Sequence, residues 1–242
     1  AADPAPAART IPAAGPGQAL AADTPEPPPP PTIPVQPPAR FVALKAKLAA
    51  LTFDDGPFDR LTEQYLAALA AKNVKATFFL VGSRARRYPT VVQQLASQGH
   101  ELANHSWRHA DMAAWEEETI DDDLAATNTI LQENGAPPPR LFRAPYGRWS
   151  PKVLRRAAAA GLEAVAWSVD PQDWREPAPE SIVARVRNQL HPGAIIILHE
   201  GHRNTAKALP LLLAALEEEG YRLVTVSELL AAGEAVRAPA QP

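Results

Sequence analysis

Short apolar runs alternate with helical patterns from residue 41 onward, and this alternation limits the fold more than any other feature of the chain. The runs predict strands buried on both faces, as in a parallel sheet covered by helices. One α/β domain, built as a barrel or as a doubly wound sheet, fits this pattern. We predict strands at residues 48–53, 76–81, 101–104, 141–143, 164–169, 194–199 and 222–226. We predict helices at residues 61–72, 89–98, 115–134, 151–160, 179–190, 206–219 and 227–231.

The first 40 residues differ from the rest, because they hold 13 of the 27 prolines, including the run at 27–31. Such a segment lacks the apolar content for a core and favours extended polyproline II. We therefore predict a disordered linker or leader at 1–40, one folded domain at 41–236 and a short tail at 237–242. Two interpretations of this segment remain open, a disordered leader or a spacer that holds the domain away from a surface, because the same residues would serve either role.

Composition excludes several classes of protein. The 24 basic and 27 acidic residues nearly balance, so we expect no nucleic-acid partner. The chain has no cysteine, so a metal would have to bind histidine and carboxylate ligands. No apolar run approaches the roughly 18 residues that span a membrane. The chain opens with small residues, as after signal-peptide removal, and we expect export to the periplasm or the medium. A shortened chain would begin in the same way.

Charged, metal-binding or aromatic residues follow five of the seven predicted strands. The C-terminal ends of parallel strands meet at one edge of a sheet, and the loops there carry the chemistry of α/β enzymes. We therefore expect these segments to face one another. They lie at residues 54–55, 104–109, 143–147, 170–174 and 198–200.

Two of these segments predict a metal site. His105 and His109 have i, i+4 spacing, which on one helical turn would place both imidazoles on one face. A carboxylate from Asp54 or Asp55 would complete a three-ligand site, the kind that leaves zinc an open position for catalysis. The alternative without a metal is that the two histidines lie on the surface and that Asp-Asp-Gly-Pro is a solvated turn. The two segments together favour the metal.

The other three segments are ambiguous alone. Arg143 could be a surface cation, but Pro145 and Tyr146 beside it favour a fork that holds a carboxylate. Asp173 could cap the following helix. His199 ends a very apolar strand, and it becomes a candidate acid only because this strand end should face the others.

Taken together, these segments resemble the polysaccharide deacetylase family, the NodB-homology domain of carbohydrate esterase family 4. The matching segments appear in the family's order: TFDDGP at 52–57, HSWRH at 105–109, RAPY at 143–146, DPQDW at 170–174 and LH at 198–199. The resemblance covers about residues 48–230. Pro171 and Glu200 depart from the usual pattern without removing a functional group. The resemblance implies an irregular, TIM-like (β/α)7 barrel and a catalytic domain at 41–236.

The resemblance also implies a division of labour at the site. Asp55, His105 and His109 would hold a divalent metal. Zinc is the expected ion, and cobalt or another divalent ion is the alternative. Asp54, positioned by Arg143, would be the general base. His199 would be the general acid, with Asp173 tuning the pKa of its imidazole. The backbone N–H of Tyr146 would help stabilise the oxyanion.

The remaining implied contacts are with the substrate. We expect Leu198 and Trp174 to line a pocket for the acetyl methyl group. We expect the sugar rings to face the aromatic side chains of Trp107, Tyr146 and Trp149.

The expected reaction is removal of N-acetyl groups from chitin oligomers, peptidoglycan or exopolysaccharide by a monomer, with release of acetate. An O-acetyl esterase on xylan would use the same residues, and a non-catalytic barrel that binds glycan is the third hypothesis. A glycosidase needs two carboxyl groups roughly 5–9.5 Å apart across one bond. Adjacent strand residues such as Asp54 and Asp55 should point to opposite faces, which disfavours that alternative.

Overall fold

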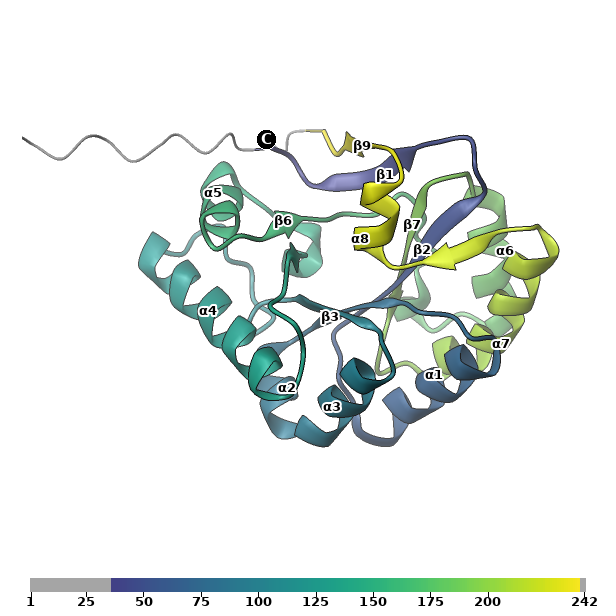
Figure 1. Cartoon of the computed structure of the whole chain (residues 1–242), viewed down its shortest axis with the longest axis horizontal. Coiled ribbons are helices and arrows are strands. Elements are labelled where there is room, and N and C mark those ends of the chain that lie inside the picture. Colours follow the sequence, from purple (N-terminus) through teal and green to yellow (C-terminus); the bar gives the residue numbers. More distant parts are fainter. Residues whose placement is uncertain (1–35, 240–242) are drawn as a thin grey trace, which may run out of the picture. The chain divides into compact units, whose positions relative to one another are not determined.

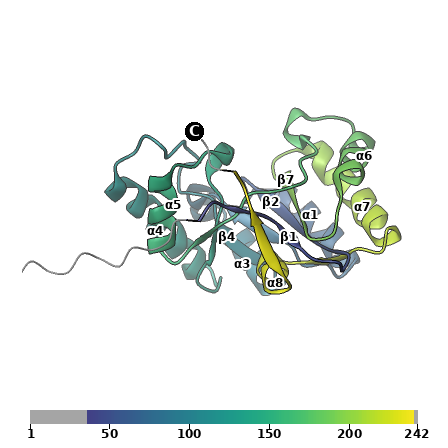
Figure 2. The ribbon, with the colours of Figure 1, turned by 90° about the horizontal axis from the view of Figure 1, so that it is seen from above.

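The computed structural model describes residues 36–239, and these residues form one sheet wrapped by helices (Figures 1 and 2). The strands are β1 Ala39–Ala43, β2 Leu48–Asp54, β3 Thr77–Leu80, β4 Glu101–Asn104, β5 Leu141–Phe142, β6 Glu163–Ala164, β7 Ala194–His199, β8 Arg222–Val224 and β9 Glu234–Arg237. The α-helices are α1 Asp59–Ala71, α2 Gly82–Arg87, α3 Pro89–Ser97, α4 Glu117–Glu133, α5 Pro151–Ala159, α6 Pro179–Gln189, α7 Arg203–Glu218 and α8 Val226–Ala231.

The sheet order is β6-β5-β4-β3-β2-β7-β1-β9, with β8 paired to the first half of β2. Strand β2 lies at the centre and is parallel to both β3 and β7. In this register Asp54 lies opposite His199 on one side and opposite Phe79 on the other. The order of the strands therefore brings together strand ends that are about 145 residues apart in sequence.

Alternate residues of the central strands pack into different layers, as the two-residue period of a strand requires. Leu51 and Phe53 belong to the cluster beneath the outer helices, where Phe53 stacks on Phe78 with ring centroids 4.9 Å apart. Ala50 and Ile195 belong to a second cluster on the inner side of the sheet. The strands are thus buried on both faces, as their apolar runs predict.

Single bridges close the sheet into a barrel. Ala39 of β1 bridges Val165, and Val169 bridges Ile196 of β7, so the irregular segment after β6 meets the opposite edge. The irregular (β/α) barrel that the resemblance implies is confirmed. The predicted strand at 164–169 is wrong beyond residue 164, because this segment makes only isolated bridges after β6.

Strands β1 and β9 lie outside the predicted alternation. They pair with each other in antiparallel orientation, and β1 also pairs with β7. Both are short and mix charged with apolar residues, so neither forms an apolar run in the sequence. β1 starts two residues before the domain start predicted at residue 41, and Ala238, after β9, is buried.

Residues 1–35 of the predicted linker and 240–242 of the predicted tail lie outside the described residues. Of the helices in residues 36–239, none has the length and apolar character of a membrane span.

Candidate active site

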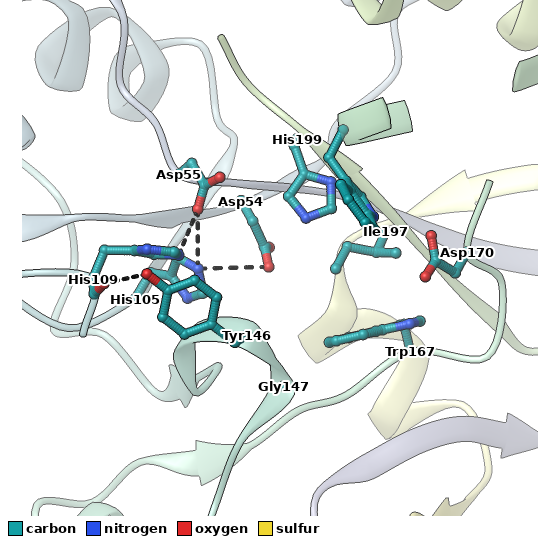
Figure 3. A pocket seen from close by; sticks show the side chains of 11 residues that line it. Asp54, Asp55, His105, His109, Tyr146, Gly147, Trp167, Asp170, Ile197 and His199 are labelled. Carbon is teal, nitrogen blue, oxygen red and sulfur yellow. Dashed lines mark hydrogen bonds and ion pairs between the residues drawn. The ribbon is translucent and has the colours of Figure 1, made fainter. Parts of the chain in front are cut away.

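A cavity of about 530 Å³ opens at the C-terminal ends of the parallel strands (Figure 3). All five segments predicted to face one another contribute to it. Its lining consists of Asp54, Asp55, His105, His109, Tyr146, Gly147, Trp167, Asp170, Trp174, Ile197 and His199.

The two adjacent acids of the first segment both face this cavity (Figure 3). Asp54 is the last residue of β2, and Asp55 has a left-handed backbone with φ of 73°. A strand residue at position 55 would point away from Asp54, but the left-handed turn brings its carboxylate back toward the same space. The prediction that the two side chains point to opposite faces is therefore wrong.

Asp55, His105 and His109 place one ligand atom each within 4.8 Å of one another. Asp55 Oδ1 lies 2.9 Å from His109 Nε2 and 3.4 Å from His105 Nε2. His105 Nδ1 lies 2.7 Å from the carbonyl oxygen of Arg143, which fits a donated N–H and leaves the Nε2 lone pair for a metal. The predicted metal ligands thus converge as a two-histidine, one-carboxylate group.

A loop, not a helical turn, brings the two histidines together. Ser106 and His109 both have left-handed backbones, with φ of 63° and 51°, and the His109 N–H donates to Ser106 Oγ at 2.9 Å. The two imidazoles lie close together as predicted, but the predicted helical turn is wrong, because a loop with left-handed residues positions them.

The charge of the site suits a cation. Burial alone would raise the pKa of Asp55, but contacts with His105 and His109 outweigh burial and hold it well below its usual range. Asp55 Oδ1 is buried and, within residues 36–239, has no hydrogen-bond partner of good geometry. An oxygen of this kind between two imidazole nitrogens fits a divalent metal such as zinc.

Asp54 is fixed by a buried arginine. Arg143 NH1 donates to Asp54 Oδ1 at 2.6 Å and to Thr52 Oγ1 at 2.8 Å, and NH2 donates to the carbonyl of Ala166 at 3.0 Å. Burial lowers the pKa of Arg143, and the Asp54 carboxylate opposes that shift. The predicted fork that holds a carboxylate is present, although only one of its nitrogens reaches Asp54. The second oxygen, Oδ2, lies 3.7 Å from Nε2 of His105, one of the predicted metal ligands.

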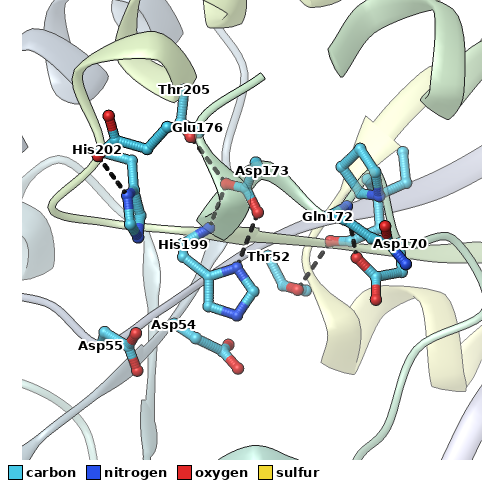
Figure 4. A network of polar contacts seen from close by, with 12 residues as sticks. Thr52, Asp54, Asp55, Asp170, Gln172, Asp173, Glu176, His199, His202 and Thr205 are labelled. Atoms are coloured by element: carbon cyan, nitrogen blue, oxygen red, sulfur yellow. Dashed lines mark hydrogen bonds and ion pairs between the residues drawn. The ribbon is translucent and has the colours of Figure 1, made fainter. Parts of the chain in front are cut away.

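His199 is oriented by Asp173 (Figure 4). Asp173 Oδ1 lies 2.8 Å from His199 Nδ1, and Oδ2 accepts the His199 backbone N–H and the Thr205 hydroxyl, each at 2.8 Å. Asp173 is fully buried, so its charge is poorly screened. Burial alone would lower the pKa of His199, but Asp173 and then the charges of Asp54 and Asp55 raise it to about 9. The imidazole is therefore charged at neutral pH and can donate a proton.

The predicted substrate residues divide into three groups. Tyr146 and Trp174 line the cavity and are 64% and 47% exposed, so a ligand can reach both. Trp149 lines a second, neighbouring cavity. Trp107 lines neither, and its ring lies instead beneath the guanidinium of Arg86.

Leu198 was the wrong residue of β7 for the acetyl pocket. It is 1% exposed and packs in the core cluster beneath the outer helices. Its neighbour Ile197 lines the cavity, two residues before the end of the strand at His199. Trp167 also lines the cavity and was missed, because residues 164–169 read as a buried strand.

Glu200 lies behind the loop that carries Asp55. It is fully buried, accepts a hydrogen bond from Thr62 Oγ1, and its backbone N–H donates to the Asp54 carbonyl at 2.9 Å. Burial raises the pKa of Glu200 to about 8. A Cβ at Gly56 would lie 1.7 Å from Glu200 Oε1. A side chain at position 56 would therefore displace the buried Glu200 carboxylate.

We expect Gly56→Ala to lower the free energy of unfolding by about 1–3 kcal/mol, the usual cost of overpacking. Urea unfolding of the metal-free protein measures it. The double variant Gly56→Ala/Glu200→Ala removes the colliding carboxylate, so its loss should be smaller than the sum of the two single losses. Strict additivity would show that Glu200 is not what excludes a side chain at Gly56.

Comparison with known proteins agrees with this geometry. The sequence profile described as polysaccharide deacetylase matches residues 42–165. The chain is 37% identical over 194 residues to a chitooligosaccharide deacetylase of Bradyrhizobium sp. (strain ANU 289), spanning 74% of this chain and 89% of that protein. It is 39% identical over 189 residues to a peptidoglycan-N-acetylglucosamine deacetylase of Bacillus cereus, spanning 76% and 88%.

Solved structures show the same likeness. A peptidoglycan N-acetylglucosamine deacetylase superposes with a TM-score of 0.77 at 30% identity, covering 84% of this chain and 96% of that one. A family 4 acetyl xylan esterase from Clostridium thermocellum, in complex with a cobalt ion, superposes with a TM-score of 0.72 at 34% identity, covering 77% and 91%. With this likeness and the five motifs gathered around one cavity, the chain belongs to the polysaccharide deacetylase family and is a deacetylase.

Proposed function

We propose that this deacetylase is a zinc-dependent enzyme that removes N-acetyl groups from polysaccharides containing N-acetylglucosamine, and that it acts as an exported monomer. One observation carries the proposal: the Asp55–His105–His109 group, Asp54 and His199 line a single cavity. A base, an acid and a place for a Lewis acid are what hydrolysis of an unreactive amide requires.

Asp55, His105 and His109 would hold the metal. When bound, zinc would polarise the acetamide carbonyl and make a water molecule more acidic. Three protein ligands are the number found in catalytic zinc sites, which keep an open position.

The proton transfers belong to the chain's own residues. Asp54 accepts a proton from water as the water oxygen attacks the acetyl carbon, and Arg143 keeps Oδ1 in place so that Oδ2 stays available. The Tyr146 N–H can donate to the developing oxyanion. His199 then protonates the sugar nitrogen, the C–N bond breaks, and acetate and a free amine leave. An amine is a poor leaving group without that proton, which gives His199 its role.

The apolar end of the cavity suits the acetyl methyl group. Ile197 and Trp174 both line it, beside His199. Trp167 lies on the same side of the cavity in Figure 3. A small acyl group held there would place its carbonyl carbon between the metal ligands and His199.

Metal dependence is the first test. Protein stripped with a chelator should release no acetate from N-acetylated chitooligosaccharides, and added zinc should restore release without cutting the chain. Acetate is measured enzymatically and chain length by mass spectrometry. Release from O-acetylated xylan alone would move the assignment to an esterase. Full activity in demonstrably metal-free protein would contradict the proposed mechanism.

A further inference from the structure

A second cavity, of about 340 Å³, adjoins the active-site cavity and shares four of its lining residues. Those shared residues are Tyr146, Gly147, Trp167 and Asp170. The remaining wall consists of Arg40 of β1, Trp149, Ala166, Ser168, Gln189, and Ala238 and Pro239, which follow β9. A polysaccharide bound with one sugar at the metal ligands must continue beyond them, and this cavity is large enough for a further pyranose ring.

The lining of the second cavity combines two indoles with one cation. Trp149 and Trp167 offer the flat apolar faces on which sugar rings stack, and both are partly buried. Arg40, the second residue of β1, lines the same cavity and is exposed. Among the residues that line either cavity, Arg40 is the one arginine or lysine.

The guanidinium of Arg40 is positioned but not neutralised. Its Nε donates to the carbonyl oxygen of Trp167 at 3.3 Å, which anchors it to the wall shared by the two cavities. No carboxylate within residues 36–239 forms an ion pair with Arg40. The acid on the shared wall, Asp170, accepts the Gln172 N–H at 2.7 Å, so its charge is partly compensated by its own loop.

We propose that the second cavity is a subsite for a sugar that carries a carboxylate, and that Arg40 recognises this carboxylate. The proposal rests on the proposed deacetylase function and narrows its substrate. Chitin and acetylated xylan backbones offer no such group. A glycan in which N-acetylglucosamine alternates with a lactyl-bearing amino sugar does, as in peptidoglycan strands freed of their peptides. Arginine suits the task because its fork matches a carboxylate and stays charged.

Three soluble tetrasaccharides test this subsite. The first is N-acetylated chitotetraose, the second alternates N-acetylglucosamine with the lactyl-bearing sugar, and the third is the second with its lactyl carboxyls converted to amides. Initial rates of acetate release with zinc-loaded protein give kcat/KM for each. The wild type should prefer the carboxylate over its amide by about threefold to fivefold at low salt, the range of an exposed ion pair. High salt should reduce this preference.

Arg40→Gln should abolish the preference, so that the carboxylate-bearing substrate and its amide are hydrolysed with equal kcat/KM. Arg60→Gln, which removes an exposed arginine on α1, should retain the preference. The proposal is overturned if the wild type does not distinguish carboxylate from amide, if Arg40→Gln still does, or if that variant loses activity equally on all three substrates. If none of the three tetrasaccharides releases acetate in the presence of zinc, the proposed deacetylase function itself is overturned.

Discussion

Asp54→Asn should lower kcat by about 10²–10⁴-fold, the usual contribution of a general base, while zinc still binds. Asparagine has the size of aspartate and can still offer an oxygen to Arg143, but it cannot accept a proton from water. The proposed zinc ligands are Asp55 and the two histidines, so affinity for zinc should stay close to that of the wild type. Rates of acetate release and competition with a chromogenic chelator measure the two quantities separately.

Asp122→Asn is a matched control, because it neutralises an exposed carboxylate on α4. It should behave as the wild type in both assays. An Asp54→Asn enzyme that keeps more than a tenth of the wild-type kcat would remove Asp54 as the base. A variant that loses zinc together with activity would make Asp54 part of the metal site.

The location of the site could be predicted because parallel strands end at one edge. Polar residues after five strands had to meet there, and the structure places Asp54, Asp55 and the three predicted histidines around one cavity, with Arg143 and Asp173 buried behind Asp54 and His199. The partners within the site follow from register, which pairs Asp54 with His199 across β2 and β7. The predicted helices correspond to α1 and to α3 through α8, but α2, a helix of six residues, was not predicted.

The direction of individual side chains was harder to predict. On β7 the sequence held the necessary signal: residues two apart share a face, so a pocket that contains His199 should contain Ile197 and not Leu198. At Asp55, His109 and Tyr146 no such signal exists. All three have left-handed backbones without being glycine, and such a conformation re-aims a side chain in a way that no periodic pattern encodes. Residues with strained backbones gather at functional sites, as they do here.

Strands β1 and β9 were missed for a different reason. They join the sheet through pairing with each other and with β7, which is a property of the assembled fold and not of either segment. Their consequence for function is direct, because β1 carries Arg40 into the second cavity.

The alkaline limb of the pH–activity profile should report His199. Asp173, and then the charges of Asp54 and Asp55, raise the pKa of His199 to about 9 in the metal-free protein. Bound zinc would offset the two aspartate charges, so the alkaline limb of the zinc enzyme should lie above the usual imidazole value and below 9. Asp173→Asn removes the charge that accepts the Nδ1–H, while the burial that lowers the pKa of His199 remains. The alkaline limb should therefore move to lower pH by about one unit or more, since a hydrogen bond to a charged group contributes roughly 1.5–3 kcal/mol. The measurement is kcat against pH with zinc at saturation.

Thr205→Val is the control, because it removes a donor to Asp173 Oδ2 but leaves the carboxylate in contact with His199 Nδ1. Its alkaline limb should stay near that of the wild type.

The raised pKa of His199 also affects the free energy of unfolding. A folded-state pKa above the unfolded value of 6.5 stabilises the protein fully below that value, and this stabilisation disappears as the pH rises through about 9. Asp173→Asn should thus lose more stability at pH 6 than at pH 10. An unmoved alkaline limb in Asp173→Asn, with stability reduced equally at both pH values, would leave Asp173 a packing role and assign the alkaline limb to another group.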